Sequence, residues 1–432
     1  MNQKIKCITA MLLAVLVIMP LLVTCGGGGE ENKAELHEQE VGSEPLILEE
    51  APTKIQRGNI RLLCMSEDDA VLNEIVSRFN QSHKEQIELI HPENENSVDT
   101  ESFYTMVLSQ EYDILVYHSY SFLRTLTEAG YLIPMDDLVG SEAEKTAYLR
   151  SVLDAGRVED SLYILAPFFT VHGVRTDSSV SREAVSSLNG LFDYIQSLSE
   201  WSNDLEREVG YLFLGEHGLD RWFDYENLTF DFSTPEFDQL LELDEILRNR
   251  SHEDGNTALS LYADPVFDAT VAGTWKPEWN YSPFPMEPGQ GYIISTSNGF
   301  VVSSEAQNLG TVEGFLTFLL SEEIQEMETT AVLGDSYAVN MELPVSRSAL
   351  QKVLKKRGTD SMGNDWTYLD EWIDRCTAMC EQADHFSFTG FVELYLPYDR
   401  AKSLPLEERR ASMEKEINAE LASWRESLYE SE

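Results

Sequence analysis

The stretch WKPEWNY, residues 275–281, holds three aromatic side chains, Trp275, Trp279 and Tyr281, beside Pro277. A flat aromatic ring can cover the apolar C–H face of a pyranose, while polar neighbours bond its hydroxyl groups. Proline in so short a stretch indicates a loop. We therefore predict that these three residues stack on a ligand. The competing interpretation is that each ring packs on its own part of the fold, because large aromatic residues dominate protein cores.

Polar residues also stand at the ends of two predicted strands. Glu67 follows the strand NIRLLCM, and Tyr117 and His118 end the strand YDILVYH. In open α/β sheets, ligands bind in the crevice at the carboxyl ends of the strands, so we predict that these three residues contact a ligand. The alternatives are helix capping for Ser66 and Glu67 and an ordinary structural role for the histidine.

The sequence lacks the common catalytic motifs. It contains no HExxH helix, no GxSxG elbow and no GxxxxGK[ST] loop. Asp136 and Asp137 are adjacent, whereas a glycosidase needs two carboxyl groups that face one another across the scissile bond. We interpret this pair as helix capping and loop solvation. The sequence therefore predicts a protein that is not an enzyme and that needs no cofactor.

Three cysteines follow the N-terminal region, at Cys64, Cys376 and Cys380. The last two lie on one apolar stripe of helical spacing that runs from Trp366 to Cys380, which favours packing in a core. A disulfide four residues apart on a straight helix is geometrically awkward, and zinc would need two further ligands that no His/Cys cluster supplies. We predict no metal site.

The chain is strongly acidic. Its 432 residues include 76 acidic and 31 basic side chains, which gives a formal charge of -45. Nucleic acid and anionic ligands are therefore disfavoured as partners. The simplest interpretation is a solvated surface that keeps an exterior protein soluble, since the acids are dispersed along the whole chain. The length is typical of two domains.

Strands and helices alternate along the chain from residue 59. The pattern predicts a strand at 59–65, a helix at 67–83, a strand at 86–90, a helix at 100–110 and a strand at 112–118. A further strand from residue 160 is stopped by Pro167. A second series follows, with helices at 188–201, 233–249 and 312–327, strands at 208–215 and 291–304, and a mostly helical end beyond residue 364. This order predicts α/β architecture with mainly parallel sheets flanked by helices.

The N-terminus has the pattern of an export signal. Two lysines precede a charge-free, almost wholly apolar stretch of sixteen residues at 8–23, shorter than the roughly 20 that span a membrane. Leu22, Thr24 and Cys25 resemble the box of a bacterial lipoprotein signal, so residues 1–24 are predicted to be removed and Cys25 to be lipidated. A short uncleaved anchor is the alternative. Residues 25–57, rich in glutamate and glycine, predict a flexible acidic tether.

Several segments, taken in order, resemble the extracellular solute-binding proteins of ABC importers, especially the family that carries sugars. They are VSRFNQSHKEQIELI, YDILVYHSYSFLRTLTEAGYLIPMDDLV, the helix after Phe230, FLTFLLSEEIQ and LPVSRSAL. Together they cover roughly residues 58–350. The segment VHGVRTD replaces the tyrosine and asparagine that are usual in this family after the first crossing between lobes.

The resemblance implies a two-lobed fold of the type II periplasmic-binding-protein class, in which ligand binds between hinged lobes. Lobe one would comprise 58–166 and 292–343, and lobe two 167–291 and 344–432. Phe168 would lie at the hinge, where it either faces the ligand or packs within the hinge. The family also places a tryptophan near ligand at the position of Trp275.

The family's function would make this a monomeric, lipid-anchored receptor on the extracellular face of a bacterial membrane. It would capture a carbohydrate, such as an oligosaccharide, and deliver it to the permease subunits of an ABC importer. Two alternatives remain open. Aromatic rings and carboxylates also suit a polyamine or another cation, whose binding would depend strongly on salt. A surface lipoprotein that docks another protein would close on no solute.

Overall fold

We describe the protein from a computed structural model. The described residues are 58–64, 69–92, 100–117, 126–127, 129–143, 147–181, 183–199, 201–202, 205, 222–224, 229–252, 258–272, 274–284, 291–296, 298–327, 342–359, 364–386, 400–401 and 403–429. All of them belong to one unit, Lys54–Glu432. The predicted signal, Cys25 and the tether lie outside the described residues.

The first three strands form the parallel sheet that their alternation with helices predicts. Among the described residues this sheet has five strands in the order β2 (Ile87–Ile90), β1 (Ile60–Leu63), β3 (Ile114–Tyr117), β15 (Gly299–Ser303) and β4 (Leu132–Ile133). Strands β1, β2 and β3 are parallel, whereas β15 pairs antiparallel to both β3 and β4. The chain therefore leaves this sheet and returns to it more than 160 residues later.

Helices cover this sheet with apolar faces set by their 3.6-residue periodicity. Helix α2 (Ala70–Ser82) buries Val71, Leu72, Ile75, Val76 and Phe79. Its N-cap is Asp69, whose carboxylate accepts a hydrogen bond from the Leu72 amide at 2.9 Å. The Phe79 ring meets Phe315 of α11 (Leu309–Leu319) edge to face, with ring centroids 5.3 Å apart. Helix α3 (Thr100–Ser109) connects β2 to β3, and helix α5 (Asp136–Ala143) follows β4.

The strand predicted from residue 160 is shorter than expected, whereas its predicted stop at Pro167 is confirmed. A short hairpin of β5 (Arg157–Val158) and β6 (Ser161–Leu162) ends before Pro167, and the long strand β7 (Phe168–Thr176) begins after it. Proline has no N–H to donate to a ladder, so it separates the two segments. Its carbonyl instead accepts the amide of Val345 at 3.1 Å.

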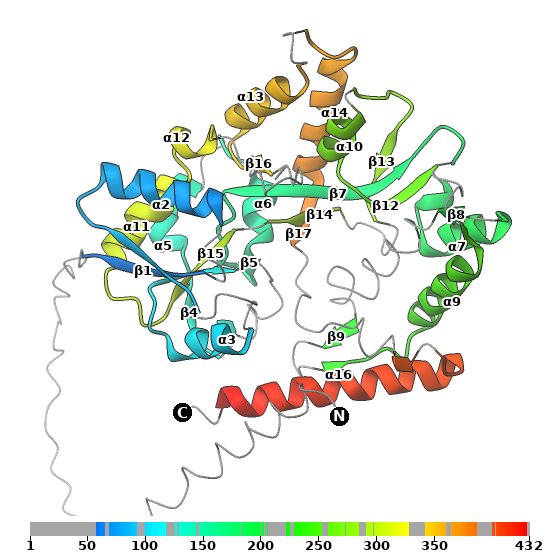
Figure 1. The fold of residues 1–432 in the computed structure, drawn as a ribbon, viewed down its shortest axis with the longest axis horizontal. Coiled ribbons are helices and arrows are strands. Elements are labelled where there is room, and N and C mark those ends of the chain that lie inside the picture. Colours follow the sequence, from blue (N-terminus) through cyan, green and yellow to red (C-terminus); the bar gives the residue numbers. More distant parts are fainter. Residues whose placement is uncertain are drawn as a thin grey trace, which may run out of the picture. The chain divides into compact units, whose positions relative to one another are not determined.

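Strand β7 connects two hydrophobic cores. Its first half places Phe168, Phe169 and Val171 in the core built around the first sheet, and Val174 lies in a second core. Figure 1 shows β7 as a long strand with β14 (Tyr292–Ser295) beside it, and the two pair antiparallel. Strands β12 (Leu259–Ala263), β13 (Asn280–Ser282), β16 (Leu343–Pro344) and β17 (Ala383–Phe386) complete this sheet of six described strands.

The single strand predicted at 291–304 is in fact two strands in different sheets. Residues 292–295 form β14 beside β7, and residues 299–303 form β15 beside β3. The break falls between Ser295 and Gly299, where Asn298-Gly299 is a dipeptide typical of turns. This turn therefore joins the two sheets.

The second core is helical on its outer side. Helix α9 (Pro235–Arg250) has proline at its first position, and the Thr234 hydroxyl accepts a hydrogen bond from the Phe237 amide. Helix α16 (Leu406–Tyr429) lies along strand β10 (Thr229–Phe230), where the Asn418 amide bonds both the N–H and the C=O of Phe230. Helix α7 (Leu188–Ser197) packs against α9.

The remaining described elements are short or lie late in the chain. They are α6 (Arg150–Ala155), η1 (Glu183–Val185), β8 (Trp201–Ser202), β9 (Phe223–Asp224), β11 (Ser251–His252), α10 (Pro265–Ala272), α12 (Glu322–Gln325), α13 (Arg347–Arg357) and α14 (Leu369–Gln382). Both cysteines of α14, Cys376 and Cys380, are free and fully buried in the first core, which confirms their predicted packing role. No helix in these described ranges combines the length and hydropathy needed to cross a membrane.

Candidate functional site

The predicted aromatic residues lie together beside β7, in the turn before β13 and in β13 itself. Trp275 and Trp279 flank a turn closed by the Trp279 amide, which donates to the Lys276 carbonyl at 3.0 Å. Tyr281 follows in β13, where it pairs with Arg175 of β7. We call Trp275, Trp279 and Tyr281 the aromatic cluster.

The aromatic cluster is packed against itself in this conformation. The Trp275 and Tyr281 rings stack with centroids 5.7 Å apart and planes 21° apart. Trp279 meets Trp275 edge to face at 6.0 Å. Trp275 is only 2% exposed and belongs to the first core, whereas Trp279 and Tyr281 are partly buried. The structure shows that these rings pack against one another and against the first core. Their role in ligand stacking stays a prediction.

A carboxylate holds the cluster to α10 and β7. Asp268 of α10 accepts a hydrogen bond from the Tyr281 hydroxyl at 2.7 Å and forms an ion pair with Arg175 at 2.8 Å. Burial, and then the charge of Asp268, raise the pKa of Tyr281 well above its ordinary value. The phenol therefore keeps its proton and acts as a donor.

The protein's own cations occupy the tryptophan faces. The Arg175 guanidinium lies 5.1 Å from the Trp279 ring centroid, and the Lys276 ammonium lies 4.9 Å from it. Arg375 of α14 lies 5.7 Å from the Trp275 ring centroid and donates to the Trp279 carbonyl at 2.9 Å. A cationic ligand would have to compete with these internal cation–π contacts.

Of the other four predicted site residues, the structure describes Phe168 in full and only the backbone of Tyr117. Phe168 is 1% exposed at the start of β7, packed in the first core, which matches the hinge-packing alternative. The backbone of Tyr117 ends β3 and pairs with Gly299. The Tyr117 side chain lies outside the described residues, as do Glu67 and His118, so their contacts with ligand stay predictions.

The structure adds a polar row that sequence reasoning missed. Thr170 and His172 alternate with buried apolar residues along β7, and the Thr170 hydroxyl lies 2.8 Å from His172 Nε2. Thr170 pairs with Ser295 of β14, so the two side chains share a face of the ladder. The alternation in FFTVHG was the available signal. The next residue along β7 is Gly173. A larger residue would not fit there, because its Cβ would lie 2.7 Å from the Tyr292 ring.

Asn298, in the turn between β14 and β15, is the second residue that the sequence did not single out. Its side chain is 1% exposed, and among the described residues neither Nδ2 nor Oδ1 meets a hydrogen-bond partner. A buried polar group without a partner costs about 1–3 kcal/mol. No pattern in the sequence distinguishes this asparagine from an ordinary turn residue.

Gln325 is the third missed residue, and its amide is fully bonded. The side chain is completely buried at the end of α12. Its Nε2 donates to the carbonyls of Pro167 at 3.1 Å and Leu319 at 2.9 Å, and its Oε1 accepts the Ser346 amide at 2.7 Å. One side chain therefore ties the segment before β7 to the segment after β16.

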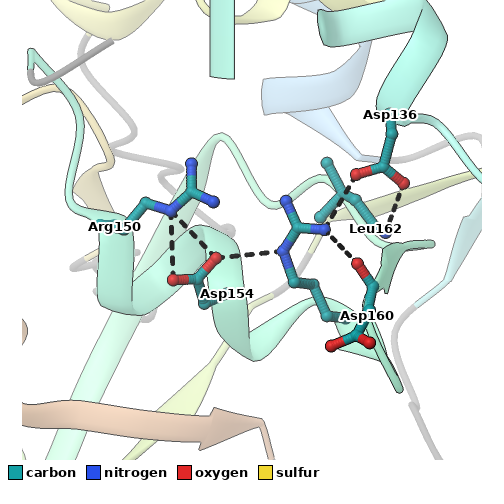
Figure 2. A network of polar contacts seen from close by, with 6 residues as sticks. Asp136, Arg150, Asp154, Asp160 and Leu162 are labelled. Atoms are coloured by element: carbon teal, nitrogen blue, oxygen red, sulfur yellow. Dashed lines mark hydrogen bonds and ion pairs between the residues drawn. The ribbon is translucent and has the colours of Figure 1, made fainter. Parts of the chain in front are cut away.

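One member of the acidic pair, Asp136, has a structural role. The Asp136 carboxylate accepts hydrogen bonds from the Leu162 amide at 2.9 Å and from the Arg157 guanidinium at 2.8 Å. Figure 2 shows Asp136 turned toward Leu162. Burial by itself raises the pKa of Asp136, but the Leu162 amide and Arg157 outweigh it and hold the pKa below its ordinary value. Asp136 is thus an ionised anchor for the β5–β6 hairpin. The described residues contain no group of three or more His, Cys, Asp or Glu side chains that could hold a metal ion.

Comparison with known proteins identifies the fold. No family model matches the chain, and no curated protein matches it in sequence. The bacterial solute receptor AcbH, described as exclusively preferring β-D-galactopyranose, is 11% identical with a TM-score of 0.53 over 85% of this chain and 99% of that chain. The cyclic alpha-maltosyl-1,6-maltose binding protein of Arthrobacter globiformis is 14% identical, with a TM-score of 0.52 over 84% and 99%.

A family 1 extracellular solute-binding protein from Alicyclobacillus acidocaldarius is also 14% identical, with a TM-score of 0.52 over 85% of this chain and 99% of that chain. The predicted fold class is therefore confirmed. The chain has the two-lobed α/β fold of extracellular solute-binding proteins. The lobe boundaries stay predictions.

Proposed function

We propose that the protein is a receptor that captures a carbohydrate between its lobes and releases it unchanged to an ABC importer. The observation that carries this proposal is the strand pair β7–β14, which joins the two cores and bears the hydroxyl groups of Thr170 and Ser295 on one face. Hydroxyl groups both donate and accept, as the hydroxyls of a sugar do. The fold supports the same proposal.

A binding cycle of this kind requires differential affinity. A solute that bound the open and closed arrangements equally would shift nothing, however tightly it bound. The permease subunits would then recognise the closed arrangement. Such a cycle needs no chemical step.

The cation alternative is less well supported. Arg175, Lys276 and Arg375 lie over the tryptophan rings that a polyamine would use. The strong acidity of the chain still favours cations at long range, so salt dependence separates the two possibilities. A neutral sugar has little charge to screen.

Thermal unfolding of the purified protein tests the proposal. The panel contains D-galactose, maltotriose, a chitin trisaccharide, xylotriose and spermidine, each at two salt concentrations. A bound solute at about a hundredfold excess over its Kd adds about 2.7 kcal/mol to the free energy of unfolding. A salt-insensitive shift with one glycan class supports the carbohydrate receptor. A shift with spermidine alone at low salt favours the cation alternative, and no shift at all favours a protein-docking lipoprotein.

We also propose that the receptor is held on the membrane through lipidated Cys25. Each buried methylene of an acyl chain contributes about 0.8 kcal/mol, so several chains anchor stably. Cys25→Ala should release the protein from washed membranes or leave the unprocessed precursor, as measured by fractionation and intact mass. Detergent-requiring retention of the variant at the mature size would contradict this anchor.

A further inference from the structure

The turn that contains Asn298 lies where the two sheets meet. It connects β14, which pairs with β7, to β15, which pairs with β3. The Asn298 amide N–H donates to the Thr296 hydroxyl at 3.1 Å, which fixes the backbone of the turn. The next residue, Gly299, pairs with Tyr117 at the carboxyl end of β3. This is the end of the sheet at which an open α/β fold binds ligands.

The Asn298 side chain is buried, and its amide forms no hydrogen bond with the described part of the chain. Nδ2 and Oδ1 are both buried, and neither has a hydrogen-bond partner in the described part of the chain. Most buried polar side-chain atoms are bonded, so two unpartnered atoms on one amide require an explanation. Gln325 provides the comparison within the same protein. Its buried amide uses both its nitrogen and its oxygen in three hydrogen bonds to backbone groups.

We propose that the Asn298 amide binds the solute, through one hydroxyl that accepts from Nδ2 and one that donates to Oδ1. This inference rests on the proposed function and adds to it a residue that selects the class of solute. A vicinal pair of hydroxyls supplies the required acceptor and donor together. An ammonium group could satisfy only Oδ1, and a carboxylate could satisfy only Nδ2.

The burial of Asn298 strengthens this selection. A group bound at a fully enclosed amide loses its water, and a neutral hydroxyl tolerates this far better than a charged group does. A site that hydrogen-bonds a substrate hydroxyl also rejects analogues that lack it, because its own polar atoms are then left unpaired. Asn298 therefore favours polyhydroxylated solutes over deoxygenated analogues as well as over cations.

Two variants of Asn298 test the inference. Asn298→Leu keeps a similar volume and removes both polar atoms, and Asn298→Ser keeps a donor and an acceptor on a smaller side chain. Without solute, Asn298→Leu should unfold at a temperature no lower than the wild type, because it removes two unpartnered buried atoms. Its Kd for the glycan that stabilises the wild type should rise at least tenfold, equivalent to 1.4 kcal/mol, and Asn298→Ser should fall between the two.

Gln325→Leu serves as the control for a bonded amide and should lower the unfolding temperature without solute. If Asn298→Leu lowers that temperature as much as the control does, the amide is structural and the inference is overturned. If the wild type binds a glycan and Asn298→Leu binds it equally well, the inference is overturned while the proposed function stands. If the wild type binds no glycan of the panel, the proposed function itself fails, and the sugar-binding role of Asn298 fails with it.

Discussion

Replacing Trp275 with alanine is expected to lower the free energy of unfolding by about 3–5 kcal/mol, the range for removing a buried aromatic ring. Trp275 is 2% exposed, stacks on Tyr281 and lies beneath the Arg375 guanidinium. The substitution leaves a cavity in the first core and removes both contacts. Urea unfolding followed by circular dichroism measures the change.

The same variant should bind the solute at least tenfold more weakly, about 1.4 kcal/mol. Trp275→Leu separates packing from binding, since it keeps an apolar side chain in the core but removes the flat ring that would stack on a sugar. A leucine variant that folds and binds the solute with an unchanged Kd would remove Trp275 from the binding site. Trp279→Ala is the matched control for stability and should cost less than Trp275→Ala, because Trp279 is only partly buried. Equal losses would contradict the burial seen for Trp275.

Replacing Gln325 with leucine should lower the free energy of unfolding by about 2–4 kcal/mol. The change leaves the buried Ser346 amide without its acceptor and removes two donors from the Pro167 and Leu319 carbonyls. Pro167 retains the Val345 amide as a second partner, so the unpaired Ser346 amide accounts for most of the loss. Hydrogen exchange of residues 343–350 should accelerate, because these amides adjoin the lost bond.

Gln351→Leu is the matched control for Gln325→Leu. Gln351 lies exposed on α13, where its amide donates to the Thr377 hydroxyl at 3.0 Å. A surface substitution of this kind should change stability by no more than about 0.5 kcal/mol. If the two glutamine variants behave alike, Gln325 does not tie the segments before β7 and after β16 together.

Much of the fold could be predicted because the spacing of apolar residues within short stretches specifies the helices and strands. The apolar residues of α2 and α9 recur at helical spacing, and the structure buries Val71, Leu72 and Phe79 of α2 and Phe237 and Leu240 of α9. Thr234 and Pro235 marked the start of α9 through capping, which is a local effect. The alternation of these helices with apolar strands indicated a parallel arrangement of β1, β2 and β3, as observed.

The candidate site could be predicted only in part. WKPEWNY identified aromatic residues that do gather beside β7, but accessibility could not be read from a proline in the sequence. The cations that cover these rings include Arg375, which lies about one hundred residues along the chain from Trp275. Long-range contacts of this kind leave no periodic signal.

The sequence by itself determined where most of the helices lie, the alternation of the first strands with helices and the apolar stripe that buries Cys376 and Cys380, because neighbouring residues set local periodicity. It did not show that the helix predicted at 312–327 is divided into α11 and α12, or that Trp201 lies in β8. Tertiary structure alone decided that residues 291–304 divide between two sheets, since strand length and apolar content do not reveal a strand's partner. Tertiary structure also decided whether each of two buried side-chain amides, those of Gln325 and Asn298, finds hydrogen-bond partners. Gln325 meets backbone groups from distant segments, and Asn298 meets none in the described chain, so only the packing around each amide distinguishes a structural group from one available to a solute.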